Sequence, residues 1–210
     1  MSILDGTHVA AGMAAVAGFV NAVAYLGLHA FVAPMTGTVV QAGFELAALD
    51  WVGASLSLLA IVAFTAGVAA ARWLRRDGRG SGPCWLLSAA VLAMAGVRPL
   101  EGLASLVPIA AALGCLNGSQ TRFGQVTLNT TFITGNLERL GEAIGDRSIT
   151  HRPAQLACIA AILVSYLAGA TTGAIAAQNL AWPLVVPATV LAVAGLMSLI
   201  RQRVTAAEAG

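Results

Sequence analysis

The chain has 210 residues, of which 58% are hydrophobic and only 10% are charged. A soluble domain carries about 25% charged residues and needs a polar skin, so this composition excludes an ordinary soluble fold and favours a chain surrounded by lipid. The mean hydropathy of +0.83 agrees, and a net charge of +2 is too small to predict nucleic-acid binding.

Six stretches are apolar and long enough, or nearly long enough, to cross a bilayer as helices, which takes about 20 residues. They cover residues 8–28, 52–74, 84–100, 103–121, 154–177 and 183–200. The third is the weakest because Arg98, Pro99 and Glu101 cut it short. Two further stretches, 29–50 and 122–152, are too apolar for loops and too broken for ordinary spans. Each either re-enters the membrane or crosses it fully.

The arginines favour the re-entrant alternative, because arginine in short loops stays on the cytoplasmic side. If both unusual stretches leave on the side they entered, ten of the eleven arginines are cytoplasmic and only Arg98 is outside. If both cross fully and the 75–83 loop stays inside, four arginines move outside: Arg147, Arg152, Arg201 and Arg203. We therefore expect both termini in the cytoplasm.

The two unusual stretches resemble each other. Asn21 precedes the first and Asn117 the second, an offset of 117 − 21 = 96, and the Thr-Gly pairs at Thr36 and Thr134 are offset by 134 − 36 = 98. An odd number of spans per half inverts the second half, an architecture common in secondary transporters. We expect one all-α integral membrane domain of two inverted-topology repeats, each with a re-entrant segment. The first covers 1–83, a short span over 84–102 links the halves, and the second covers 103–210.

The Thr-Gly pairs are the candidate solute site. Glycine relaxes the backbone and threonine or asparagine often caps helices, so each pair predicts a helix start. Helix starts present unpaired N–H groups and a positive dipole end, so two opposed starts near the midplane would suit a polar or anionic solute. The alternative is two kinked helices that cap locally and bind nothing. The candidate binding residues are Asn21, Tyr25, Thr36, Gly37, Thr38, Asn117, Thr134, Gly135 and Asn136.

Three carboxylates are candidates for proton or ion coupling, because ionisable groups inside a membrane are costly and usually functional. They are Glu45, Glu138 and Glu142. The alternative for the last two is a position near the cytoplasmic surface, and for Asn21 and Asn117 a role in holding helices together. No residue pattern predicts a catalytic centre, a metal site or a cofactor.

The motifs Gly18-Phe19-Val20-Asn21 with Met35-Thr36-Gly37, and Thr134-Gly135-Asn136 with Arg139-Leu140, resemble the YoaK-like bacterial membrane family, also known as domain of unknown function 1275. The resemblance covers nearly the whole chain. It implies a bacterial inner-membrane protein of about six spans. The family usually shows Met-Thr-Gly-Asn in the first broken segment, where this chain has Thr38.

Taken together, these patterns predict a small secondary transporter or permease rather than an enzyme. A non-catalytic scaffold or accessory subunit is the alternative. The expected partners are the lipid bilayer and a small-molecule or ion substrate, and a homodimer would give so short a chain a fuller pathway.

The topology predicts that reporter domains fused at Gly80 and at Gly102 report opposite sides of the membrane, because one apolar span separates the two positions. Alkaline phosphatase activity and fluorescence of a cytoplasmic reporter measure this directly. The same side for both positions would contradict the topology.

Overall fold

The computed structural model describes residues 3–76, 80–97, 100, 102–119, 133–145 and 152–208. These residues form eight α-helices and no strand. The helices are α1 (Ile3–Leu28), α2 (Met35–Ala47), α3 (Trp51–Leu74), α4 (Gly82–Gly96), α5 (Gly102–Gly118), α6 (Ile133–Gly145), α7 (Arg152–Asn179) and α8 (Val185–Glu208).

Four helices are long and apolar enough to cross a membrane: α1, α3, α7 and α8, over Thr7–Leu28, Trp51–Leu74, Leu156–Asn179 and Val185–Thr205. The apolar helices α4 and α5 have only 15 and 17 residues. At about 1.5 Å per residue they are about 22 and 25 Å long, short of the ~30 Å hydrocarbon core. The prediction of a helical membrane protein is supported, and four of the six predicted spans have the length of a crossing.

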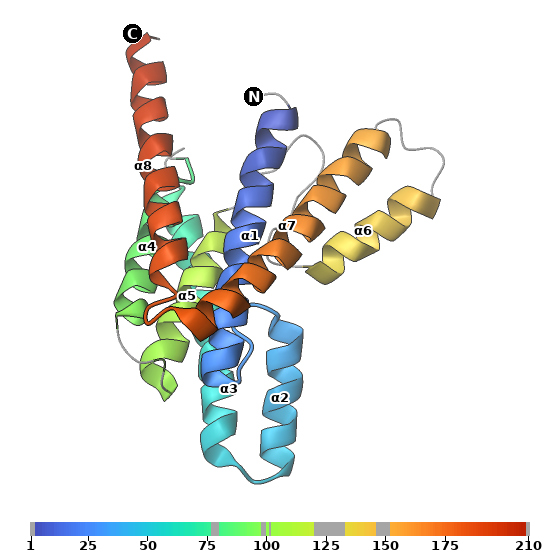
Figure 1. The fold of residues 1–210 in the computed structure, drawn as a ribbon, viewed down its shortest axis with the longest axis vertical. Helices are drawn as coiled ribbons and strands as arrows, with labels where there is room; N and C mark the ends of the chain where they lie inside the picture. The colour runs from blue at the N-terminus through green and yellow to red at the C-terminus, as the bar shows by residue number, and fades with distance from the viewer. Residues whose placement is uncertain are drawn as a thin grey trace.

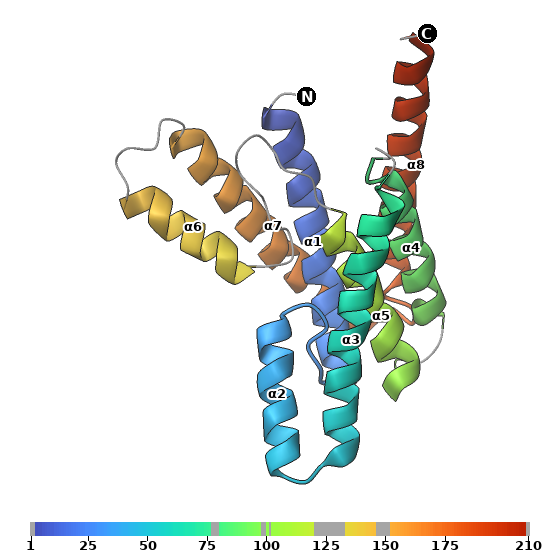
Figure 2. The ribbon, with the colours of Figure 1, turned by 180° about the vertical axis from the view of Figure 1, so that it is seen from behind.

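Helices that are distant in sequence pack in pairs: α1 on α7, α3 on α5 and α4 on α8 (Figures 1 and 2). Glycines make the first two crossings close. A methyl group at Gly18 of α1 would overlap the carbonyl oxygen of Tyr166 in α7, and one at Gly114 of α5 would overlap that of Phe64 in α3. Lipid removes the hydrophobic drive between helices, so close backbone contact supplies the attraction instead.

Apolar side chains occupy both the interior and the outer surface. Val20, Leu113 and Leu191 are fully buried between helices. Val62 of α3 and Val164 of α7 are exposed on the outside, with 62% and 66% of their surface uncovered. Apolar surface of this extent on long helices is suited to lipid rather than to water.

The segment between α1 and α2 turns back along α1, and α2 then runs in the same direction as α1. In Figure 1, α1 runs downward, the chain then turns back upward, and α2 starts beside α1 and runs down past its end to the lower end of the molecule, where α3 begins. His29 makes the reversal with a positive φ of 51°. The backbone N–H of Ala33 donates to Oδ1 of Asn21, seven residues before the end of α1 at Leu28. The start of α2 therefore lies about 10 Å along α1 from its end.

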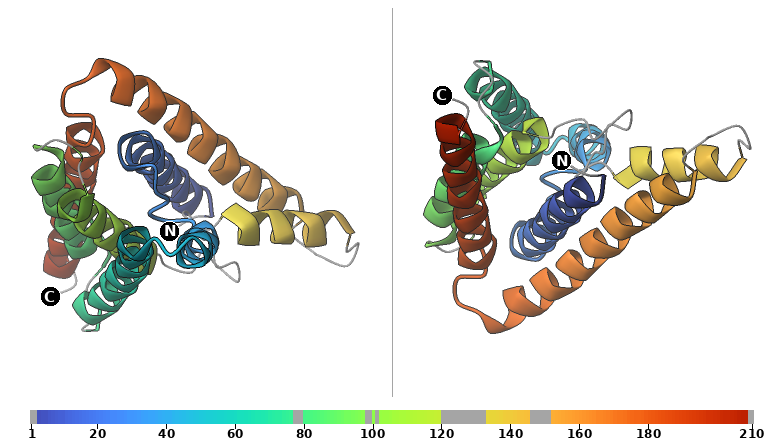
Figure 3. Two further views of the ribbon diagram at one scale, coloured as in Figure 1. Left: turned by 90° about the horizontal axis from the view of Figure 1, so that it is seen from below. Right: turned by 90° about the horizontal axis from the view of Figure 1, so that it is seen from above.

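The helix α6 packs against α7 and starts close to the start of α2, near the middle of the molecule (Figures 1 and 3). From there the two helices run apart, α2 to the lower end and α6 outward and upward. Residues 122–132 and 146–151 of the second unusual stretch lie outside the described residues.

The start of α1 and the end of α8 lie toward the upper end of the molecule in Figure 1, and so do the end of α3 and the start of α4 (Figure 2). Arg75 and Arg76 follow α3 there, and Arg201 and Arg203 lie in the last turns of α8. The start of α1, the end of α3 and the end of α8 thus lie toward one end of the molecule. Arg98, which was expected at the opposite end, lies outside the described residues.

Two alanine substitutions within α1 test the glycine crossing. Gly18→Ala should lower the free energy of unfolding by about 1–3 kcal/mol, because the new methyl group must displace the backbone of α7. Gly12→Ala is the matched control: nothing lies within 4 Å of its Cβ position, so it should be neutral or stabilise by up to about 1 kcal/mol. Unfolding of the purified protein in mixed detergent and denaturing micelles measures both. Equal effects would contradict the crossing.

Candidate functional site

Asn21 joins three parts of the structure. Its side chain is only 8% exposed. Its Nδ2 donates to the carbonyl oxygen of Ala17 and to the hydroxyl of Tyr166, each at 3.0 Å, and its Oδ1 accepts from Ala33 N–H at 3.2 Å. One amide thus connects α1, α7 and the segment leading into α2. It satisfies a backbone donor outside any helix, which lipid could not do.

The residues at the start of α2 make their hydrogen bonds within the same stretch of chain. The helix begins at Met35 with Pro34 as N-cap, within two residues of the predicted break. Thr36 is exposed and makes no capping hydrogen bond, so the expectation that this threonine caps the helix is wrong. The buried residue is Thr38, whose hydroxyl donates to the carbonyl oxygen of Phe31 at 3.1 Å.

The second helix break has the same pattern of burial. Thr134 is exposed, as Thr36 is. Asn136 is 0% exposed, and Thr38, at the matching position of the first motif, is 1% exposed. In both motifs the buried side chain therefore belongs to the residue two places after the threonine. The glycine between them is partly buried in each motif.

A cavity of about 440 Å³ lies between α2 and α3 and extends to the start of α5. Thr38, Gln41 and Glu45 line it from one face of α2, and Ser57 lines it from α3. The Glu45 carboxylate accepts from Gln41 Nε2 at 3.0 Å and from Ser57 Oγ at 2.7 Å. Glu45 is the one acidic residue among the lining residues.

The other predicted site residues are not brought together with this cavity. Tyr25 is largely exposed and stacks on Phe31, with ring centroids 4.9 Å apart. Glu138 and Glu142 are exposed on α6 and do not line this cavity. Asn117 is partly buried near the end of α5.

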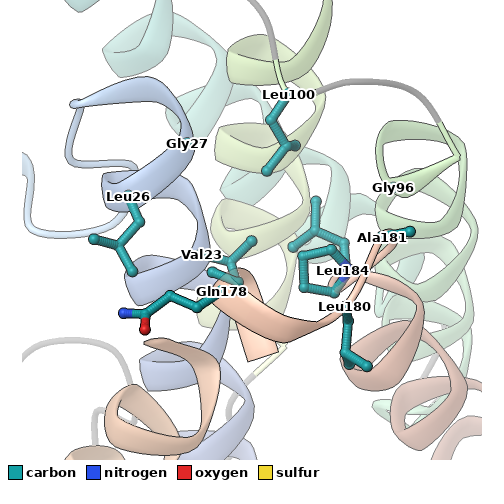
Figure 4. Close-up of a pocket in the computed structure, with 11 residues that line it drawn as sticks. Val23, Leu26, Gly27, Gly96, Leu100, Gln178, Leu180, Ala181 and Leu184 are labelled. Atoms are coloured by element: carbon teal, nitrogen blue, oxygen red, sulfur yellow. The ribbon is translucent and has the colours of Figure 1, made fainter. Parts of the chain in front are cut away.

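A second cavity of about 380 Å³ lies where α7 turns into α8 against α1 and α4 (Figure 4). Its lining is apolar apart from Gln178, and Val23 and Leu184 form much of its wall. It shares Gly27 and Leu100 with the first cavity, which we call the Glu45 cavity, and these two residues are in contact. The packing of Leu100 on Gly27 therefore separates the two cavities.

Sequence reasoning missed three partners of the predicted residues: Tyr166, Gln41 and Ser57. The chain has only two tyrosines, and a hydroxyl in the middle of an apolar span was the available signal for Tyr166. The spacing of Thr38, Gln41 and Glu45 along one helical face was the signal for the cavity lining. Among the described residues, no three His, Cys, Asp or Glu side chains are grouped as a metal site requires.

Two substitutions separate the roles of the Asn21 hydrogen bonds. Tyr166→Phe removes one hydroxyl and should cost about 0.5–1 kcal/mol of unfolding free energy, the usual value for such bonds in membranes. Asn21→Leu also leaves the Ala33 N–H without its acceptor and should cost about 2 kcal/mol or more. Equilibrium unfolding of both variants and the double variant measures the coupling. If Asn21→Leu costs no more than Tyr166→Phe, Asn21 does not hold the broken segment.

The family described as protein of unknown function DUF1275 matches residues 9–197, from the first turns of α1 into α8. No curated protein and no solved structure matches the chain. The family match includes α1, both broken segments and the Glu45 cavity. The resemblance drawn from the motifs is thereby confirmed, and the chain belongs to the DUF1275 family.

Proposed function

We propose that this protein is a small secondary transporter or permease for a small polar or anionic solute. The observation that carries the proposal is the pair of opposed helix starts at the middle of the molecule, each with one buried polar side chain, Thr38 and Asn136. Helix starts offer N–H donors and a positive dipole end to a solute. Broken helices at membrane depth are typical of transporter sites.

The proposal includes an inverted repeat. The first argument for this repeat comes from the positions of the glycines at the helix crossings. Gly18 of α1 faces the Tyr166 carbonyl in α7, and Gly114 of α5 faces the Phe64 carbonyl in α3. The glycines differ by 114 − 18 = 96 positions and their partners by 166 − 64 = 102. A repeat that relates α1 to α5 and α3 to α7 accounts for both contacts.

The reciprocal crossings follow the same offsets. Gly169 of α7 faces the Ala15 carbonyl, and Gly67 of α3 faces the Ala111 carbonyl. Here 111 − 15 = 96 and 169 − 67 = 102, as before. The helices α1 and α5 run in opposite directions in Figure 2, as inverted topology requires. In this proposal six helices cross the membrane, with α2 and α6 as the re-entrant pieces.

The orientation of the proposed transporter follows from its arginines. The end that holds both termini carries Arg75, Arg76, Arg201 and Arg203, so it faces the cytoplasm of the bacterial inner membrane. Of the three coupling candidates, Glu45 is the best supported because it lines a cavity.

A membrane scaffold or accessory subunit is the second candidate function. The observation in its favour is that the Thr38 hydroxyl already reaches two local carbonyl oxygens, those of Phe31 and Pro34, at 3.1 and 3.5 Å. Such a helix start is complete without a solute. A scaffold needs no aqueous route to Thr38 or Asn136, and this difference can be tested.

Single cysteines distinguish the two functions. In a variant with Cys84, Cys115 and Cys158 replaced by alanine, Thr38→Cys and Asn136→Cys should react with a charged, membrane-impermeant thiol reagent in vesicles. Water must reach the site for a polar solute to pass, which is the reason for the expectation.

Val62→Cys is the matched control, since Val62 is 62% exposed on the outer face of α3 and should stay unlabelled in lipid. Mass spectrometry of the intact protein measures the labelling. If both site cysteines stay as unreactive as Val62→Cys, the scaffold alternative replaces the transporter.

A further inference from the structure

The Glu45 carboxylate has only neutral hydrogen-bond partners among the described residues, and His29 is the one basic residue in the lining of its cavity. The two oxygens of Glu45 accept hydrogen bonds from Gln41 and Ser57. Glu45 also lies two residues before the end of α2 at Ala47, where the helix dipole is negative and opposes a carboxylate. A partly buried carboxylate without a positive partner is costly, so this position favours a bound cation.

The cavity beside Glu45 is shaped for a molecule rather than for a bare ion. Its volume of about 440 Å³ is in the range of small-molecule sites, which are mostly apolar with a few placed polar groups. Leu28, Phe31, Leu56 and Leu106 supply apolar wall. A hard metal cation needs about six or more oxygen ligands, and Glu45 is the one carboxylate in this lining.

We infer that this cavity binds a small organic cation, with an ammonium group at Glu45 and an apolar body against Phe31, Leu56 and Leu106. A carboxylate has about four acceptor positions, and Gln41 and Ser57 occupy two of them. The remaining positions accept N–H donors of an ammonium group. The Phe31 ring lines the same cavity and adds a face to which cations are attracted.

The inference deepens the proposed function, and it rests on that function only for the statement that the bound cation is also the transported solute. It narrows the polar solute to one that carries an ammonium group, while binding itself requires no transport. Thr38 lines the cavity at the other end of α2, so the site reaches the helix start described above.

The binding test uses the purified full chain in detergent and three probes of equal length: n-butylammonium, n-butanol and butyrate. Butylammonium at ten times its dissociation constant should raise the unfolding temperature by about 3 °C, whereas butanol and butyrate at equal concentration and ionic strength should not. A shift with butyrate that equals or exceeds the butylammonium shift, or no butylammonium shift at all, overturns the inference.

Variants connect the shift to the carboxylate. Glu45→Gln keeps the shape and removes the charge, so the butylammonium shift should be lost, and Glu45→Asp should restore part of it. Gln178→Leu, in the second cavity, is the control and should leave the shift unchanged. A full shift in Glu45→Gln overturns the inference. If Glu45→Gln does not fold, Ala60→Leu fills the cavity while keeping the charge, and a full shift in that variant overturns it as well.

Uptake of radiolabelled butylammonium into proteoliposomes separates the inference from the proposed function. Binding without uptake retains the cation site and removes the transporter. Uptake of butyrate without any binding of butylammonium retains a transporter and removes the cation site.

Discussion

One constraint governs the middle of this molecule: backbone N–H and C=O groups that leave a helix inside a membrane must find partners within the protein. In the proposed arrangement the segment over residues 29–34 is such a backbone, and two side chains supply its partners. Asn21 accepts from the N–H of Ala33, and Thr38 donates to the carbonyl of Phe31. These bonds hold the start of α2 beside α1. The polar residues of α2 and the cavity that they line depend on this placement.

The crossings at glycines determine how closely the helices around that segment approach one another. Because Gly18 and Gly169 have no side chain, α1 and α7 approach closely enough for Asn21 to reach the Tyr166 hydroxyl. The pair α3 and α5 crosses in the same way through Gly67 and Gly114. Small residues therefore have two consequences here: they make the packing of apolar helices favourable, and they bring a polar pair together at the point where α2 begins.

The two halves related by the proposed repeat differ in chemistry. At the matching position of the crossings, Tyr166 in α7 corresponds to Phe64 in α3, which has no hydroxyl. At the offset of the Thr-Gly motifs, 143 − 45 = 98, the carboxylate of Glu45 corresponds to Ala143, which is fully buried. At this matched position the carboxylate lies in the first half only, where a cavity of about 440 Å³ accompanies it. In the proposed repeat, the half that holds Glu45 is the half to which we assign the cation site.

The sequence by itself determined the membrane class, the approximate positions of the helices and the helix starts at the two Thr-Gly motifs, since composition and apolar length are local properties read against the thickness of a bilayer. It also identified Asn21, Thr38, Asn136 and Glu45 as polar residues in apolar surroundings. It did not separate Thr36 from Thr38, because which of the two faces inward depends on the direction of α2 after the chain reverses. Only the tertiary structure decided that Tyr166 meets Asn21 and that Ser57 meets Glu45. The first contact joins residues 145 positions apart and arises from how the glycine-lined helices α1 and α7 cross. The second joins residues 12 positions apart and arises from how α3 packs back against α2, and no local pattern records either arrangement.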